Sequence, residues 1–304
     1  MKHYLFKTPL LILFLLLPCP DPALGKGRKE MLVNTSWLAR QGAGSGLVIL
    51  HVAPDRSTYD RGHIPGARYV PLGEIIISRD GLPNEMPPVS ALQQLFTKLG
   101  IGNRDRIVIY GEPSVLSATR TLFTLAYLGH GGRGALLDGG LAKWRAEGYP
   151  VEQATPSFSP STFTPRLNPG LIVGLEAMRN LSWVAANLAP PNVSIVDSRS
   201  PEVYAGSAEK KTGHIPGAIN RFWMDDLEKE GGALRSRAEL DQAYAAIGLN
   251  RDRMTVSYCN TGMQSSHTWF VLQYLGIDSL LYDGSMAEWS RATNAPIVSG
   301  NSPK

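Results

Sequence analysis

The chain has 304 residues, of which 43% are apolar and 18% are charged, so it is long enough for two compact domains and too apolar for a disordered protein. Its formal net charge is only +4 and no dense cluster of lysine and arginine occurs, which argues against nucleic-acid binding.

Residues 1–25 are typical of a secretory signal peptide. A basic start precedes an unbroken apolar run at 10–17, and small residues at 23–25 suit cleavage. That run rises about 12 Å as a helix, far less than a bilayer core of roughly 30 Å. We therefore expect a periplasmic or secreted protein with no membrane contact beyond this segment. We also expect a monomer. The alternatives for the segment are an uncleaved membrane anchor and a lipoprotein attached at Cys19. After cleavage Cys259 is the sole thiol, so neither an internal disulfide nor a multi-cysteine metal site can form.

The remainder of the chain repeats itself. Four motifs recur in the same order at offsets of 145 to 151 residues, which indicates a tandem duplication. The pairs are Gly62–Ala67 with Gly213–Ala218, Leu99–Ile101 with Ile247–Leu249, Tyr127–Gly129 with Tyr274–Gly276, and Asp138–Gly140 with Asp283–Ser285. We assign the first copy to 26–152 and the second to 173–304. The stretch 153–172 between them is rich in proline, serine and threonine, which predicts an extended linker.

Within the second copy, short β-rich runs alternate with helical patterns. The β-rich runs are 193–197, 254–258 and 280–282, and the helical patterns are 238–247 and 265–275. Each helical pattern ends at a glycine, Gly248 or Gly276, as helices often do. This alternation predicts an α/β fold with a parallel sheet and helices on both faces.

The sharpest chemical feature is Cys259, which follows a predicted strand and precedes a short loop containing Gly262. Sites in open parallel sheets form beyond the carboxyl ends of the strands. The N–H groups of the loop and of the following helix would converge on the sulfur and favour the nucleophilic thiolate. A buried apolar cysteine is the structural alternative.

These motifs together resemble the rhodanese family, whose tandem-domain members are sulfurtransferases acting on thiosulfate or 3-mercaptopyruvate. The resemblance rests on Gly-His-Ile-Pro-Gly-Ala in both copies, Asp197-Ser198-Arg199 after a strand, Cys-x-x-Gly and Asp-Gly-Ser, and covers about residues 30–300. It implies two rhodanese-like domains, each a parallel sheet flanked by helices, with no cofactor and no metal. The expected partners are a small anionic sulfur donor and a thiol or cyanide acceptor.

By resemblance, Cys259 carries a persulfide between the two halves of the reaction, and Arg199 faces the anionic end of the donor. The loop residues that would surround the transferred sulfur are Asn260, Thr261, Gly262, Met263, Gln264 and Ser265. A guanidinium suits a sulfonate or a carboxylate because it binds in a two-pronged fork. A salt bridge from Arg199 to Asp197 or Glu202 is the structural alternative.

Several positions depart from the family pattern and bear on the donor. Asn260 and Thr261 stand where some thiosulfate-acting members have basic residues, and Val203 stands where mercaptopyruvate-acting members usually have a second arginine. Met286 occupies a place where tryptophan is frequent. Because the loop amides serve a compact dianion without a second arginine, we favour thiosulfate over 3-mercaptopyruvate.

The first copy lacks the nucleophile, since Gly111 aligns with Cys259. Glu112 adds a negative charge there and Pro113 removes an N–H donor. We expect this copy to be structural and to form one wall of the other copy's pocket.

Two other functions are considered. A phosphatase of the same fold needs an arginine six residues after the cysteine, where this chain has Ser265. A non-catalytic exported sulfur carrier or redox-sensing module stays as the alternative function.

The repeated residues outside the cysteine loop are interpreted as structural, because they occur in both copies. His63 and His214 belong to the turn motif, Trp144 and Trp289 to the core, and Asp138 and Asp283 to turns.

Overall fold

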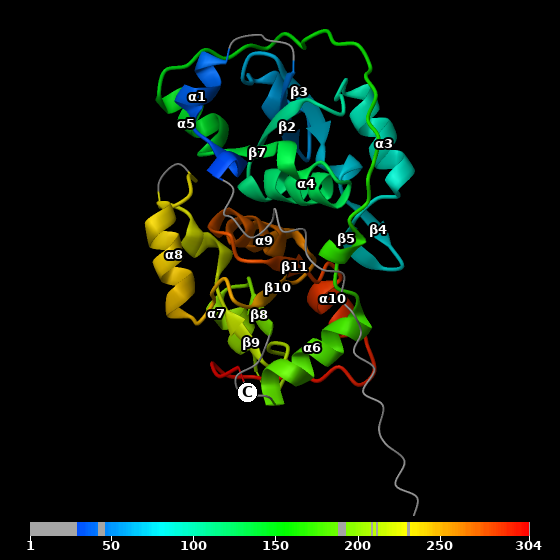
Figure 1. Cartoon of the computed structure of the whole chain (residues 1–304), viewed down its shortest axis with the longest axis vertical. Coiled ribbons are helices and arrows are strands. Elements are labelled where there is room, and N and C mark those ends of the chain that lie inside the picture. Colours follow the sequence, from blue (N-terminus) through cyan, green and yellow to red (C-terminus); the bar gives the residue numbers. More distant parts are fainter. Residues whose placement is uncertain are drawn as a thin grey trace, which may run out of the picture.

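The computed structural model describes residues 29–41, 46–187, 193–207, 209–210, 212–229 and 232–303. The expected signal peptide, its cleavage point and Cys19 lie outside these residues. The chain forms two α/β units arranged one above the other along the long axis of the molecule (Figure 1). Within the described residues, no helix is both long enough and apolar enough to cross a bilayer.

The first unit contains, in chain order, β1 (Leu32–Val33), α1 (Thr35–Arg40), β2 (Leu47–Ala53), α2 (Ser57–Asp60), β3 (Ala67–Pro71), β4 (Ile77–Arg79), β5 (Leu82–Glu85), α3 (Val89–Lys98), β6 (Arg106–Gly111), α4 (Val115–Tyr127), β7 (Gly134–Leu137) and α5 (Gly140–Ala146). The second contains α6 (Leu175–Asn187), β8 (Val193–Asp197), α7 (Pro201–Ala205), β9 (Ala218–Asn220), α8 (Arg237–Ala246), β10 (Met254–Tyr258), α9 (Met263–Leu275), β11 (Ser279–Leu281) and α10 (Ser285–Trp289). Short 3-10 helices are η1 (Lys29–Met31), η2 (Leu72–Glu74), η3 (Gly131–Arg133), η4 (Pro169–Leu171) and η5 (Trp223–Asp226).

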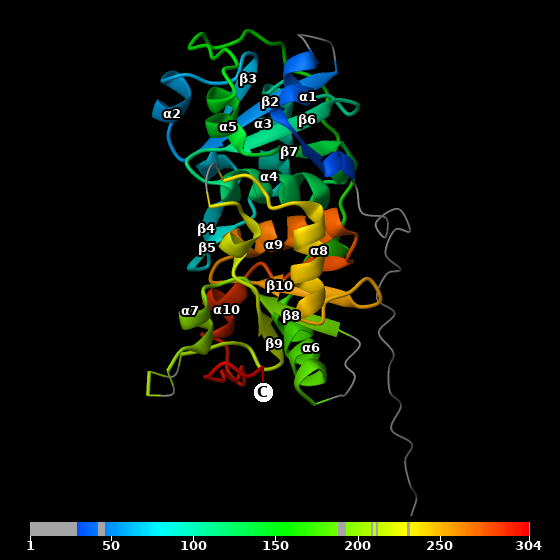
Figure 2. The ribbon, with the colours of Figure 1, turned by 90° about the vertical axis from the view of Figure 1, so that its left-hand side faces the viewer.

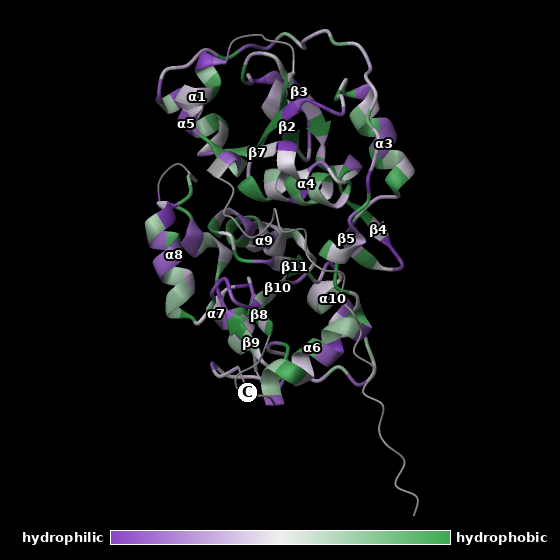
Figure 3. Cartoon of the chain, in the orientation of Figure 1, coloured by the Kyte–Doolittle hydropathy of each residue, from purple (hydrophilic) through white to green (hydrophobic). Residues whose placement is uncertain are grey.

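Each unit is built on a parallel sheet, as predicted. The strand orders are β1-β7-β6-β2-β3 and β11-β10-β8-β9. Helices cover both faces, so the central strands are buried along nearly their whole length, and all five residues of β8 are buried. Figure 3 shows hydrophobic residues concentrated on β2 and β7 and hydrophilic ones on the outer helix α8.

The predicted elements of the second unit are found with small shifts at their ends. The strand at 254–258 is confirmed as β10, and the strand expected at 280–282 lies one residue earlier, as β11. Helix α9 begins at Met263, two residues before the predicted start. Gly262 has a φ of +81° immediately before α9, and this left-handed turn lets the helix start directly after the cysteine loop.

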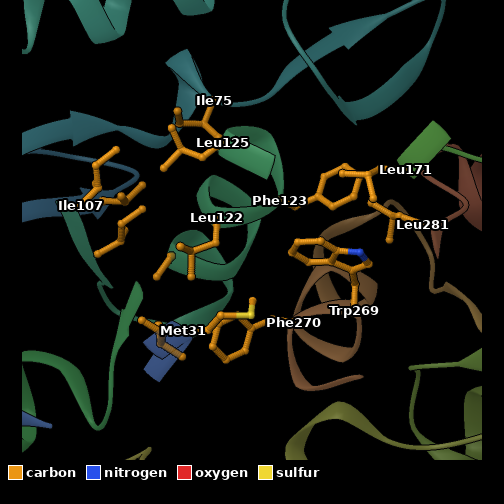
Figure 4. Packing of buried hydrophobic residues seen from close by; sticks show 14 of the residues in the cluster. Met31, Ile75, Ile107, Leu122, Phe123, Leu125, Leu171, Trp269, Phe270 and Leu281 are labelled. Atoms are coloured by element: carbon orange, nitrogen blue, oxygen red, sulfur yellow. The ribbon is translucent and has the colours of Figure 1, made fainter. Parts of the chain in front are cut away.

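The two units share one hydrophobic core. Helix α4 of the first unit packs on helix α9 of the second, and one cluster of buried apolar residues spans both (Figures 1 and 4). Phe123 meets Trp269 edge to face across this boundary, with ring centroids 5.0 Å apart. The expectation that the first copy packs against the second is confirmed by these contacts.

Two further segments tie the units together. The antiparallel β4–β5 hairpin extends from the first unit to α10 of the second (Figures 1 and 2). The predicted linker is without helix or strand at 156–168 and runs along the first unit, where Arg166 N–H donates to the carbonyl of Leu128 at 2.8 Å. The position of the second unit is therefore set by packing over a broad surface.

Candidate active site

Cys259 lies directly after β10, at the carboxyl end of the sheet, where β8 and β11 flank it. It is the one cysteine among the described residues, and only 1% of its surface is exposed. Its Sγ lies 3.5 Å from the Thr261 backbone nitrogen and 3.5 Å from the Ser265 hydroxyl, both of which donate toward it. The N-terminus of α9, with its partial positive charge, begins beside the sulfur at Met263. This arrangement stabilises negative charge on the sulfur.

Ser285 holds the cysteine loop through its hydroxyl group, and the sequence analysis did not identify it as a site residue. Its hydroxyl accepts the backbone N–H groups of Cys259 and Gly262 at 3.1 and 3.2 Å and donates to the Tyr282 carbonyl at 2.9 Å. Ser285 is fully buried and has a φ of +51°, a conformation that favours glycine. The first copy has Gly140 in this place, also with positive φ. The sequence signal for the role of Ser285 was that the cysteine-bearing copy has serine where the other copy has glycine.

Arg199 lies beside the loop and forms a salt bridge with Asp197. This salt bridge is the structural alternative that the sequence analysis gave for Arg199. Its Nε and Nη2 both bond the buried carboxylate of Asp197, at 2.9 and 2.5 Å, while Nη1 lies 3.5 Å from the Asn260 Oδ1. Burial alone would lower the pKa of Arg199, but the hydrogen bonds and charge of Asp197 and the nearby Cys259 raise it. Arg199 therefore carries a permanent charge beside the cysteine loop, where its Nη1 contacts Asn260.

The other predicted loop residues enclose the sulfur with different exposures. Asn260 is exposed, and Thr261, Met263 and Gln264 are half-buried. Gly262 is buried, and a Cβ there would collide with the carboxylate of Asp283. Asn260 is thus the exposed side chain among residues 260–265.

The first unit reaches the same loop through two residues that the sequence analysis did not single out. Asn84, on strand β5 of the β4–β5 hairpin, donates from Nδ2 to the Thr261 hydroxyl at 2.8 Å. Arg120, on α4, is fully buried and pairs with Asp283 at 2.5 and 3.0 Å. No motif marks either residue, because each is adjacent to the loop only through the packing of the two units.

The equivalent site in the first unit cannot hold a nucleophile. Tyr110 pairs with His51 in the sheet as Tyr258 pairs with Asp197, so Gly111 follows as Cys259 does. A Cβ at Gly111 would collide with the Ser114 carbonyl and lie 2.9 Å from the backbone nitrogen of Ala118. Burial, and then the charges of His63 and Arg145, lower the pKa of His51 to about 4, so it is neutral where the second unit has a carboxylate.

The repeated aspartates lie at a turn and a bend, as predicted, and they have a further role. Asp283 and Asp138 do more than terminate turns, because each contacts the other unit. Asp283 pairs with Arg120, and the Asp138 carboxylate accepts the Leu234 N–H at 2.9 Å. Contacts between residues 163 and 96 positions apart leave no trace in a local pattern.

The structural interpretation of the other repeated residues is confirmed. His63 and His214 are fully buried, and their Nδ1 atoms lie 2.9 and 3.0 Å from the carbonyls of Tyr59 and Tyr204, on whose rings they stack. Trp144 and Trp289 are buried in the core.

A pocket of about 310 Å³ opens between the units, but Cys259 is absent from its walls. Arg79, Glu85, Tyr127, Val173, Asp283 and Glu288 are among its lining residues. None of residues 259–265 lines it, so we do not regard it as the reaction site. Within the described residues, no group of three or more histidine, cysteine, aspartate or glutamate side chains could hold a metal ion.

Known proteins resemble the chain along nearly its whole length. A model of the rhodanese-like domain matches residues 35–147 and again 180–292. The chain is 33% identical over 302 residues to a thiosulfate sulfurtransferase of Corynebacterium glutamicum, covering 94% of this chain and 96% of that protein. It is 31% identical over 294 residues to the sulfur carrier protein TtuD of Thermus thermophilus, covering 91% and 99%. The structure of the 3-mercaptopyruvate sulfotransferase SseA of Escherichia coli matches in fold, with a TM-score of 0.73 at 23% identity, over 84% of this chain and 98% of that one.

Proposed function

Because the chain belongs to the rhodanese family and contains its domain twice, we propose that it is a sulfurtransferase that moves a sulfane sulfur from thiosulfate to a thiophilic acceptor through a persulfide on Cys259. The observation that carries this proposal is the arrangement around Sγ. A backbone N–H and a hydroxyl lie 3.5 Å from the sulfur, and the N-terminus of α9 begins beside it. Such a set of fixed dipoles stabilises a thiolate and the persulfide anion that replaces it.

In the first half-reaction, the Cys259 thiolate attacks the outer sulfur of thiosulfate. The new S–S bond forms as the old one breaks, and sulfite leaves with the bonding electron pair. Arg199 Nη1, held by the Asp197 carboxylate on its other side, faces the departing anion. In the second half-reaction, a thiolate or cyanide attacks the terminal sulfur, and the electron pair of the S–S bond returns to Cys259. The transfer is covalent catalysis in two steps.

The preference for thiosulfate follows from the charges available at the loop. Two of the three guanidinium nitrogens of Arg199 are used by Asp197, and position 203 holds an exposed valine in place of a second arginine. The carboxylate of 3-mercaptopyruvate therefore lacks one of the two arginines that would bind it. The loop N–H groups suit thiosulfate, which is a compact dianion. The test is the ratio of second-order rate constants for the two donors, measured at one ionic strength on the wild type and on Val203→Arg. We expect thiosulfate to be favoured and the variant to gain mercaptopyruvate use; a wild-type ratio of about ten or more in favour of mercaptopyruvate would refute the preference.

The experiment that tests the function is intact mass after incubation with each donor, followed by turnover with cyanide. A gain of one sulfur atom on Cys259, with thiocyanate formed over many cycles, is expected. The similarity to a sulfur carrier protein favours a second candidate, an exported carrier that loads one equivalent and turns over slowly. Loading without multiple turnover would support that candidate, and no loading from either donor would overturn both.

We also propose that the protein acts outside the cytoplasm, since its first 25 residues have the pattern of a signal peptide. N-terminal sequencing of the exported protein should find a mature chain that begins near Lys26. A chain that begins at Met1 would contradict cleavage.

A further inference from the structure

The fully buried guanidinium of Arg120 lies in the unit that has no nucleophile, yet it is directed at the cysteine loop of the other unit. Helix α4, which carries it, lies against α9 (Figure 1). Its Nη1 and Nη2 bond the Asp283 carboxylate, and Nη2 also donates to the Asn84 carbonyl at 2.8 Å. A buried ion pair costs desolvation, and a well-packed apolar pair often serves stability as well. Stability alone therefore does not explain why the Arg120–Asp283 ion pair is buried here.

Both partners of Arg120 touch groups that hold the sulfur. Asp283 lies against Gly262, whose N–H is bonded to Ser285, and a Cβ at Gly262 would be 3.2 Å from Arg120 Nη1. Asn84 bonds the hydroxyl of Thr261, whose backbone N–H is directed at Sγ. Two chains of contacts thus run from Arg120 to Cys259, one through Asp283 and one through Asn84.

The charge balance at the sulfur depends on this residue. From the second unit, Asp197 neutralises Arg199 and leaves the pair close to neutral. Asp283 lies against Gly262 of the cysteine loop, and it would be an uncompensated anion there if Arg120 were absent. Burial alone would lower the pKa of Arg120, but Asp283, Glu85 and Cys259 together raise it, so Arg120 stays charged in its buried site. Two further carboxylates, Glu85 and Glu288, line a pocket together with Asp283, and Glu85 pairs with Arg79 at 3.1 Å.

We propose that Arg120 is a positioning residue through which the first unit sets the charge state and the geometry of the Cys259 loop. It offsets Asp283 and anchors the hairpin that fixes Thr261. The unit without a nucleophile thus completes the active site of its neighbour. This inference deepens the proposed function and concerns the same sulfur, but it depends only on the formation of a thiolate there.

The test is the pH dependence of Cys259 alkylation by iodoacetamide on the full chain, which requires no sulfur donor. In Arg120→Met the midpoint of the profile should rise by about one pH unit or more, as for loss of a nearby compensating charge. In Asp283→Asn, which keeps the cation, the midpoint should fall. The double variant should lie near the wild type. Arg68→Met is the matched control, because it removes a half-buried arginine of the first unit that contacts Leu99 and Phe158 rather than the cysteine loop, and it should leave the profile unchanged.

Opposite shifts of the alkylation midpoint in Arg120→Met and Asp283→Asn distinguish this role from that of a merely structural ion pair. If the pair were only structural, either substitution would disturb the loop in the same way and shift the midpoint in the same direction. If Arg120→Met does not fold, Asp283→Asn decides alone: a lower midpoint supports the proposal, and an unchanged or higher one overturns it. Wild-type midpoints in both folded variants would also overturn it. A chain that shows these shifts but loads no sulfur would refute the proposed function and leave this inference standing.

Discussion

Ser285 offers the most direct test of how the cysteine loop is built. In Ser285→Ala, the buried N–H groups of Cys259 and Gly262 lose their acceptor. Each unpaired buried donor costs about 1–3 kcal/mol, so the loss of two bonds should destabilise the variant by roughly 2–6 kcal/mol. In Ser285→Gly the same bonds are lost, but the strain of a side chain at φ +51°, about 1 kcal/mol, is relieved.

Both variants should therefore load sulfur slowly, while the glycine variant is the more stable of the two. If about 2 kcal/mol of the loss appears in the transition state of loading, that step slows by roughly thirty-fold. The assays are urea unfolding and single-turnover loading followed by intact mass. Gly140→Ser, at the equivalent place of the first unit, is the matched control, because a Cβ there meets nothing nearer than 3.9 Å. It should cost about 1 kcal/mol of strain and leave loading unchanged. Wild-type loading rates in both Ser285 variants would refute the reasoning.

Three further predictions follow from the same contacts. Cys259→Ser should abolish loading and turnover with stability within about 1 kcal/mol, since the change is nearly isosteric; residual turnover above a few per cent would contradict a sole nucleophile. Arg199→Ala, made with Asp197→Asn so that no buried carboxylate is left unpaired, should slow loading by about ten-fold and change discharge of a preloaded persulfide much less; equal damage to both steps would identify a structural arginine. Burial raises the pKa of Asp226 from its ordinary 3.8 to about 6, so the folded state binds this proton more tightly than the unfolded state, and the stability that this group contributes should fall by about 3 kcal/mol as pH rises from 4 to 6. Burial lowers the pKa values of His51 and His267, which act in the opposite direction over this range, so the measurement is the difference in unfolding free energy between the wild type and Asp226→Asn. That difference should fall by about 3 kcal/mol as pH rises from 4 to 6, and a difference independent of pH would refute the prediction.

The sequence by itself determined the duplication, the parallel α/β units and the place of Cys259 at the carboxyl edge of a sheet. Apolar runs of strand length recur with their flanking glycines, so the order of the elements could be read locally. The place of Cys259 followed in turn, because a residue after a central parallel strand must emerge at the edge where sites form. The starting point of α9 was less well defined, since it depends on the left-handed turn at Gly262.

Only the tertiary structure decided what surrounds the sulfur. Arg120 and Asn84 belong to the first unit, 163 and 177 positions from Asp283 and Thr261, and they meet these partners because α4 packs on α9 and the hairpin extends across the boundary. The sequence also left the role of Arg199 open, and the fold brings it against Asp197. Hydrophobic periodicity records which face of an element is buried, but the residue it meets there depends on how whole elements pack, and this active site is assembled at such a packing surface.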